Sequence, residues 1–319
     1  MAGLKRDENG VWTLEREDGD DYRDEYFDEP FARYLTAFDP AFARAEEVCE
    51  SEFVKALVRI GGAQDAGWDP YETTLRAIPA VRDLHKLLPD DGDWKDFETA
   101  RHLQLWMYGH IIEASEPYAI LADMLHIADG GFFMPYRFPD KELRRAREGE
   151  IFPPKRPWFF SEKLPELETL AAAADLERVL DPVREIWDNQ LRNAVFHADY
   201  SLCGGEVRTR GKTYEHEEIL NLVNRALAYH EALALLVEQN RLGYQEPKLL
   251  ALHTDAGGPE ECGVVMVRDG VGAIGFKHPY TAEEIARGAI AWSMARLFPD
   301  EAAALREDPE LAHFPARPD

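Results

Sequence analysis

The chain has few cysteines, no long apolar run and far fewer cations than anions. Its three cysteines, Cys49, Cys203 and Cys262, lie far apart, and their odd number argues against a disulfide framework. No pair of them has the spacing of metal ligands. No apolar run approaches the roughly 20 residues that a membrane span requires, and the charged N-terminus lacks the apolar segment of a signal peptide. We therefore expect a soluble, cytoplasmic protein without membrane contact, bound metal or cofactor.

The shortage of positive charge bears directly on function. With 36 Lys and Arg against 61 Asp and Glu, the formal net charge is −25. Proteins that hold nucleic acid by its phosphates usually have a basic face, so this balance argues against extended nucleic-acid binding. Two short basic stretches run against the trend, at residues 141–147 (KELRRAR) and 208–212 (RTRGK). A solvated surface is the alternative interpretation of each.

The spacing of apolar residues predicts a mainly helical protein in four parts. The first is an acidic arm with a helical region (1–130), and the second is a connecting loop rich in proline and aromatic residues (131–165). A helical core (166–245) and a small α+β unit (246–319) follow. The expected helices cover residues 40–60, 94–114, 115–130 and 215–240, after an aromatic stripe with helical spacing at 26–42.

The last part of the chain changes from helical to strand-like spacing. Residues 248–253, 263–267 and 271–276 are predicted as strands, and Asp269-Gly270 between the last two is typical of a hairpin turn. Thr281 opens a capping box, which predicts a helix over 281–297. We expect a three-stranded antiparallel sheet with one helix.

The stretch 187–200 (WDNQLRNAVFHADY) carries the most informative polar residues. It ends a pattern that predicts a long helix from about residue 175, broken near Pro182. Asn193 and His197 are four residues apart and therefore share a helix face. Arg192 and His197 are five apart, which places them well round the helix from each other, so a second antiparallel copy would bring them together more easily. Residues 199–212 are predicted as a connection with glycine turns.

The pattern Arg-polar-x-x-x-His, here Arg192 to His197, resembles the signature of the HEPN superfamily of helical nucleotide-binding and ribonuclease domains. The similarity extends through the turn region to the following long helix. It implies an HEPN-like multi-helix bundle and a homodimer in which two motifs face each other. It also implies metal-independent RNA cleavage that leaves a 2′,3′-cyclic phosphate and a 5′-hydroxyl, as in toxins and defence effectors. An antitoxin or regulatory protein is a further possible partner.

The residue types suit this chemistry. Histidine is the side chain that ordinarily titrates near neutrality, so His197 suits acid or base work. The fork of Arg192 matches phosphate oxygens, and Asn193 can orient either the imidazole or the phosphate. Further RNA contacts are expected from four nearby residues: Tyr200, Arg208, Arg210 and Lys212.

Three alternatives stay open from the sequence. Arg192 and His197 can simply satisfy carbonyls at a helix end, in a non-catalytic module that binds a nucleotide or a protein partner. The loop 131–165 can act as a lid in an enzyme of another class, although no nucleophile motif supports this. A metal site at His102, His110 and His126 is disfavoured because their spacing matches no helical metal motif.

Overall fold

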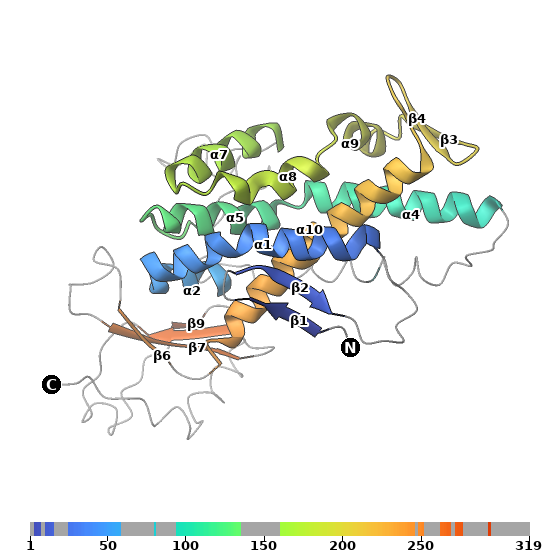
Figure 1. Ribbon diagram of the computed structural model, residues 1–319. Helices are drawn as coiled ribbons and strands as arrows, with labels where there is room; N and C mark the ends of the chain where they lie inside the picture. The colour runs from blue at the N-terminus through green and yellow to red at the C-terminus, as the bar shows by residue number, and fades with distance from the viewer. Residues whose placement is uncertain are drawn as a thin grey trace. The chain divides into compact units, whose positions relative to one another are not determined.

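The computed structural model describes residues 3–7, 10–15, 25–58, 80, 94–134, 160–245, 248–251, 262–268, 272–276 and 293–294. This part of the chain is mostly helical, as predicted (Figure 1). Within it, no helix combines the length and the apolar character needed to cross a membrane. The chain forms two compact units, each built from separate stretches: residues 1–40, 69–118 and 140–235 make the first, and 41–68, 119–139 and 236–319 make the second.

Helices dominate the first unit. It contains α4 (Trp94–Glu113), α7 (Phe160–Ala173), the 3-10 turn η1 (Glu177–Leu180), α8 (Asp181–Ile186) and α9 (Asn189–Phe196). It also holds the first parts of α1 (Glu25–Val48), α5 (Ser115–Ala128) and α10 (His216–Leu242). The predicted helices at 94–114, 115–130 and 215–240 are therefore confirmed. Helix α7 begins inside the range predicted as a connecting loop.

Buried aromatic rings hold the helices of the first unit together. The ring of Tyr229 on α10 meets Phe38 of α1 edge-on at 5.7 Å between centroids, and Tyr118 of α5 at 6.1 Å. Helix α8 is fastened to α1 by Glu185, which accepts hydrogen bonds from Tyr34 at 2.9 Å and from Arg33 at 2.5 and 2.8 Å. The hydrogen bonds from the Arg33 guanidinium lower the pKa of Glu185, so the Glu185 carboxylate is ionised while it holds α8 against α1.

A short hairpin covers the start of α1. Strand β2 (Trp12–Glu15) pairs antiparallel with β1 (Gly3–Arg6). The Trp12 backbone N–H donates to Thr36 Oγ1 at 3.1 Å, and Arg6 forms an ion pair with Asp39. The N-terminal segment is thus docked on α1 through a strand edge and a charge pair.

The second unit contains α2 (Glu50–Val58) and the later residues of α1, α5 and α10. Phe42 and Phe53 meet edge-on at 6.4 Å in its core. Buried Glu52 accepts a hydrogen bond from the Phe133 backbone N–H at 2.9 Å, which anchors the segment after α5. Tyr244 donates toward Glu46 at 2.9 Å and Glu50 at 3.0 Å, so the end of α10 is held beside the carboxylates of α1 and α2.

An antiparallel sheet completes the second unit, in the order β6-β7-β8-β9. The three predicted strands are confirmed as β6 (Lys248–Ala251), β7 (Cys262–Arg268) and β8 (Gly272–Phe276). A helix was predicted over 281–297, but two residues in this range form strand β9 (Ser293–Met294), which pairs with β8. The prediction is wrong for these two residues. An edge strand has unpaired backbone groups, and pairing with it outweighs the local helix preference. The rest of that predicted helix lies outside the described residues, as do Asp269 and Gly270.

The long helix predicted to end in the motif is also wrong. Helix α7 ends at Ala173, Asp175 adopts a positive φ of 59°, and Trp187 is extended before the eight-residue α9 begins. Pro182 lies in the first turn of α8, where its missing N–H costs nothing, so it starts a helix and does not break one. The opposite error occurs at Pro40. The end of α1 and α2 cover most of the helix predicted over 40–60, but its predicted start is wrong because α1 continues through Pro40 to Val48.

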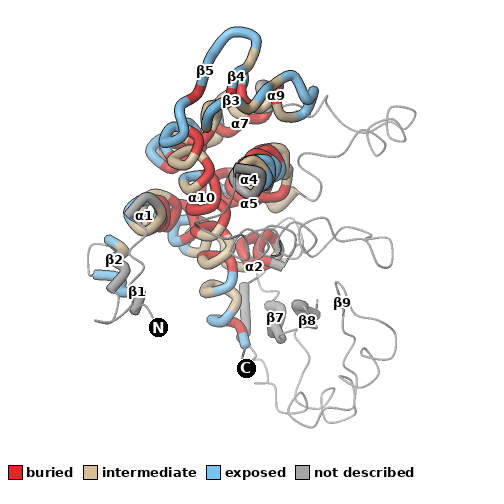
Figure 2. The backbone as a smooth tube through the Cα atoms, turned by 90° about the vertical axis from the view of Figure 1, so that its right-hand side faces the viewer, coloured by how far each residue is buried: buried red, intermediate tan, exposed pale blue. Residues whose placement is uncertain are grey.

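Residues 199–212, predicted as a connection, begin a small antiparallel sheet. Its strands are β3 (Tyr200–Cys203), β4 (Glu206–Thr209) and β5 (Thr213–Tyr214), in that order. The predicted turn at Gly204 and Gly205 is confirmed, with φ of 60° and 94°. Only Val207 and Tyr214 among the strand residues are buried, and most of the hairpin is exposed in Figure 2. The mostly polar strands lack an apolar alternation that would predict them.

Candidate functional site

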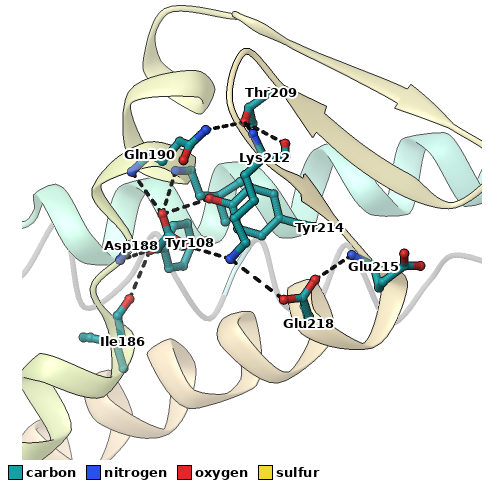
Figure 3. Close-up of polar contacts among 10 residues, drawn as sticks. Tyr108, Ile186, Asp188, Gln190, Thr209, Lys212, Tyr214, Glu215 and Glu218 are labelled. Carbon is teal, nitrogen blue, oxygen red and sulfur yellow. Dashed lines mark hydrogen bonds and ion pairs between the residues drawn. The ribbon is translucent and has the colours of Figure 1, made fainter.

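Helix α9, which carries the motif, is fixed at its first turn by Asp188. The Asp188 Oδ1 atom accepts from the backbone N–H groups of Gln190 at 3.0 Å and Leu191 at 2.9 Å, as an N-cap (Figure 3). The same oxygen accepts from the buried Tyr214 hydroxyl at 2.9 Å. One carboxylate therefore caps α9 and ties it to strand β5.

Two further contacts fix Asp188 itself. The Tyr108 hydroxyl of α4 accepts from the Asp188 backbone N–H at 3.0 Å and donates to the Ile186 carbonyl at 3.0 Å. Lys212 Nζ lies 3.6 Å from Asp188 Oδ2 and 3.8 Å from Glu218 on α10. Figure 3 shows these groups converging at the start of α9. The position of the motif thus depends on α4, the hairpin and α10.

Gln190 connects α9 to the turn between β4 and β5. Its amide oxygen accepts from the backbone N–H groups of Gly211 at 3.1 Å and Lys212 at 2.9 Å. A Cβ at Gly211 would lie 2.7 Å from the end of the Gln190 side chain, so a larger residue here would displace the amide from this contact. This contact fixes the turn that carries Arg210 against the helix that carries His197.

A cleft of about 300 Å³ opens between α9 and this turn. It brings together three of the residues predicted from the sequence, namely Asn193, His197 and Arg210. His197 is the C-cap of α9, where its backbone N–H donates to the Asn193 carbonyl at 3.0 Å while its side chain is exposed. The full lining is Asn189, Gln190, Asn193, Ala194, His197, Asp199, Thr209 and Arg210. An imidazole, an amide and a guanidinium therefore share one open cleft.

Arg192 does not line this cleft. Its side chain lies on the α4 side of α9, where it pairs with Glu113 and crosses the Phe196 ring at 5.2 Å. It also donates to the Asn193 Oδ1 atom at 2.8 Å. Within one chain, Arg192 therefore contacts the lining of the cleft through Asn193.

A buried lysine lies close to the Glu113–Arg192 pair. Lys163 of α7 donates to the Ser115 hydroxyl at 2.8 Å and lies 5.3 Å from the centre of the Tyr118 ring. Burial lowers the pKa of Lys163 to about 8, and Arg192 acts in the same direction while Glu113 opposes it.

The other expected RNA contacts lie apart from the cleft. The Tyr200 hydroxyl is 2.8 Å from His102 Nδ1 on α4, and Arg208 is exposed and paired with Glu206 at 2.8 Å. Lys212 is held over the Tyr214 ring at 4.0 Å beside Asp188. Arg210 differs, because no ion pair to its guanidinium is present in the part of the chain that the structure describes.

Four residues that shape the site were not predicted from the sequence: Asp188, Gln190, Asp199 and Tyr214. Asp188 had a detectable signal, since an aspartate directly before N-Q-L suits an N-cap. Gln190 and Tyr214 act through contacts with other elements, and Asp199 lines the cleft. Within the described ranges, no group of three or more His, Cys, Asp or Glu could hold a metal ion.

Comparison of the chain with protein-family models, with curated proteins and with solved structures yields no match. The function is therefore inferred from the geometry and chemistry of the cleft.

Proposed function

We propose that this chain is a metal-independent endoribonuclease of HEPN type, with His197 as its acid or base. The observation that carries the proposal is the shared cleft, in which the exposed His197 imidazole lies with the Arg210 guanidinium and the Asn193 amide. A titratable group beside a permanent cation is the minimum required for phosphodiester cleavage without metal.

The proposed reaction is an internal transesterification. The 2′-oxygen of the RNA attacks the adjacent phosphorus while a base takes its proton, and the bond from phosphorus to the 5′-oxygen breaks. The leaving 5′-oxygen takes a proton from an acid, which gives a 2′,3′-cyclic phosphate and a 5′-hydroxyl. Arg210 would stabilise the negative charge on the phosphate, and Asn193 would orient the phosphate or the imidazole.

This chemistry needs one group to accept a proton and another to donate one. A homodimer would supply a second copy of His197 by two-fold symmetry, as the HEPN resemblance implies. Arg192 takes a different role from the one expected from the sequence, because it is paired with Glu113. We propose that it positions Asn193, to which it donates at 2.8 Å.

A second candidate function is a non-catalytic module that binds a nucleotide or a protein partner. The observation that favours it is the same Arg192–Glu113 pair, since the motif arginine is satisfied within its own chain. In that case, Arg210 and Asn193 would hold a phosphate group without cleaving it.

The test is RNA cleavage by the purified protein in EDTA, with products analysed for a 2′,3′-cyclic phosphate. His197→Ala should lower the cleavage rate by about 100-fold or more, the usual contribution of a general acid or base. The matched control is His126→Ala, because His126 is half-buried in the second unit and does not line the cleft. It should cleave at the wild-type rate.

Two outcomes reject the nuclease. One is cleavage that His197→Ala leaves unchanged, and the other is no cleavage of single-stranded, looped or duplex RNA. If nucleotide binding is then lost in Arg210→Ala, the binding module is supported in its place.

A further inference from the structure

A row of exposed rings lies on α4 beside the motif helix. His102, Trp106 and His110 follow one another at four-residue intervals and therefore share one face of the helix. All three are exposed, and 40% of the Trp106 surface is accessible. The Trp106 and His110 rings lie 3.9 Å apart between centroids.

Two neighbouring elements add rings to this row. Tyr200 of β3 lies beside His102, with ring centroids 5.8 Å apart. Phe196 of α9 packs near Gly109 of α4, since a Cβ there would lie 3.3 Å from the Phe196 ring, yet 45% of Phe196 is accessible. We define the ring surface as His102, Trp106, His110, Phe196 and Tyr200.

The composition of the ring surface points to a particular kind of partner. Its members are planar rings without an aliphatic centre, and the Arg192 guanidinium lies 5.2 Å over Phe196. Unpaired bases stack on such rings, and each stacked base typically raises affinity by about 5- to 150-fold. The Arg192 charge also neutralises Glu113 at the edge of this surface, which reduces repulsion of a phosphate backbone.

We propose that the ring surface is a stacking platform for the unpaired bases of single-stranded RNA. The proposal rests on the proposed function, and it names the substrate form that the cleft of His197 would receive. Phe196 is the last residue of α9 and His197 is its C-cap, so one short helix contributes to both the ring surface and the cleft. Paired bases already stack on one another in a duplex and present only their edges, so the platform selects unpaired RNA.

A second copy of the chain is a weaker candidate for this surface. Stable dimers usually bury about 800 Å² on each partner around an apolar centre. Here only Trp106 and Phe196 are large exposed apolar side chains, and imidazoles and a guanidinium surround them. Planar rings beside a guanidinium fit stacked bases better than they fit another apolar face.

The test measures binding in EDTA by fluorescence anisotropy, in a His197→Ala background that prevents cleavage. The probes are an oligouridylate of about 12 nucleotides and an abasic oligomer with the same number of phosphates. The oligouridylate should bind more tightly, and Trp106→Ala should weaken its binding by about 5- to 150-fold without changing abasic binding. Trp106→Phe should restore most of the loss because it keeps a ring.

Leu242→Ala is the matched control, since Leu242 is 47% accessible but lies outside the ring surface. Equal binding of the two probes, or no effect of Trp106→Ala, rejects the platform. A change from dimer to monomer in Trp106→Ala, measured by sedimentation, also rejects it and assigns the surface to self-association. His197-dependent cleavage with unchanged Trp106→Ala binding rejects only the platform, whereas base-dependent binding without cleavage in the wild type rejects only the nuclease.

Discussion

Asp188 should have a larger effect on stability than its position at the surface of a short helix suggests. Replacing it with alanine removes the N-cap of α9, which typically costs about 1 kcal/mol. It also leaves the Tyr214 hydroxyl, on a residue only 2% accessible, without its acceptor. An orphaned buried hydroxyl costs about 1–3 kcal/mol. The ion pair with Lys212 is half-exposed and adds little.

The expected loss for Asp188→Ala is therefore about 2–4 kcal/mol of unfolding free energy. A double-mutant cycle with Tyr214→Phe separates the two contributions. Once the Tyr214 hydroxyl is gone, Asp188→Ala should cost only the cap. The two substitutions should therefore be less than additive, by about 1–3 kcal/mol.

The assay is urea denaturation of the wild type, the two single variants and the double variant at pH 7. Asp181→Ala is the control, because Asp181 also lies at a helix start but is exposed, and its one ion pair among the described residues is with Arg184 at 3.2 Å. Its effect should stay within about 0.5 kcal/mol. Strict additivity of Asp188→Ala and Tyr214→Phe would refute the shared hydrogen bond as the source of the loss.

Two further predictions concern buried contacts near α4. Lys163 is 3% accessible and its pKa falls from 10.5 to about 8, so the unfolded chain binds its proton more tightly. Lys163→Met should therefore raise stability below pH 8 by up to about 3 kcal/mol, a gain that shrinks between pH 8 and 10.5 in paired urea titrations. For Gly109→Ala, the new Cβ would lie 3.1 Å from Val195. The cost of this overpacking should exceed the roughly 1 kcal/mol that alanine gains over glycine in helix propensity, so the variant should unfold at a lower temperature than the wild type. A higher unfolding temperature would show that α9 can shift to make room for the methyl group.

The spacing of the motif residues predicted their arrangement only in part. Asn193 and His197 line the same cleft, as their four-residue interval predicted, although His197 caps α9 and does not lie within it. The position of Arg192 beside Glu113 was not predictable, because the two residues are 79 positions apart. Arg210 was one of four residues expected to contact RNA. It lines the cleft because Gln190 binds the turn that carries it, and the sequence does not show that contact.

The sequence by itself determined the elements whose apolar residues repeat at a regular interval. These include α4, α5, α10 and strands β6 to β8, because the spacing of apolar residues along a short segment predicts which of its faces is buried. Tertiary structure decided where the motif helix begins and how the exposed hairpin pairs. The predicted continuous helix is interrupted at Asp188, just before α9, because Tyr108 binds the Asp188 backbone and Tyr214 binds its carboxylate, both from distant elements. Such contacts join residues far apart in the chain, and no local periodicity encodes them.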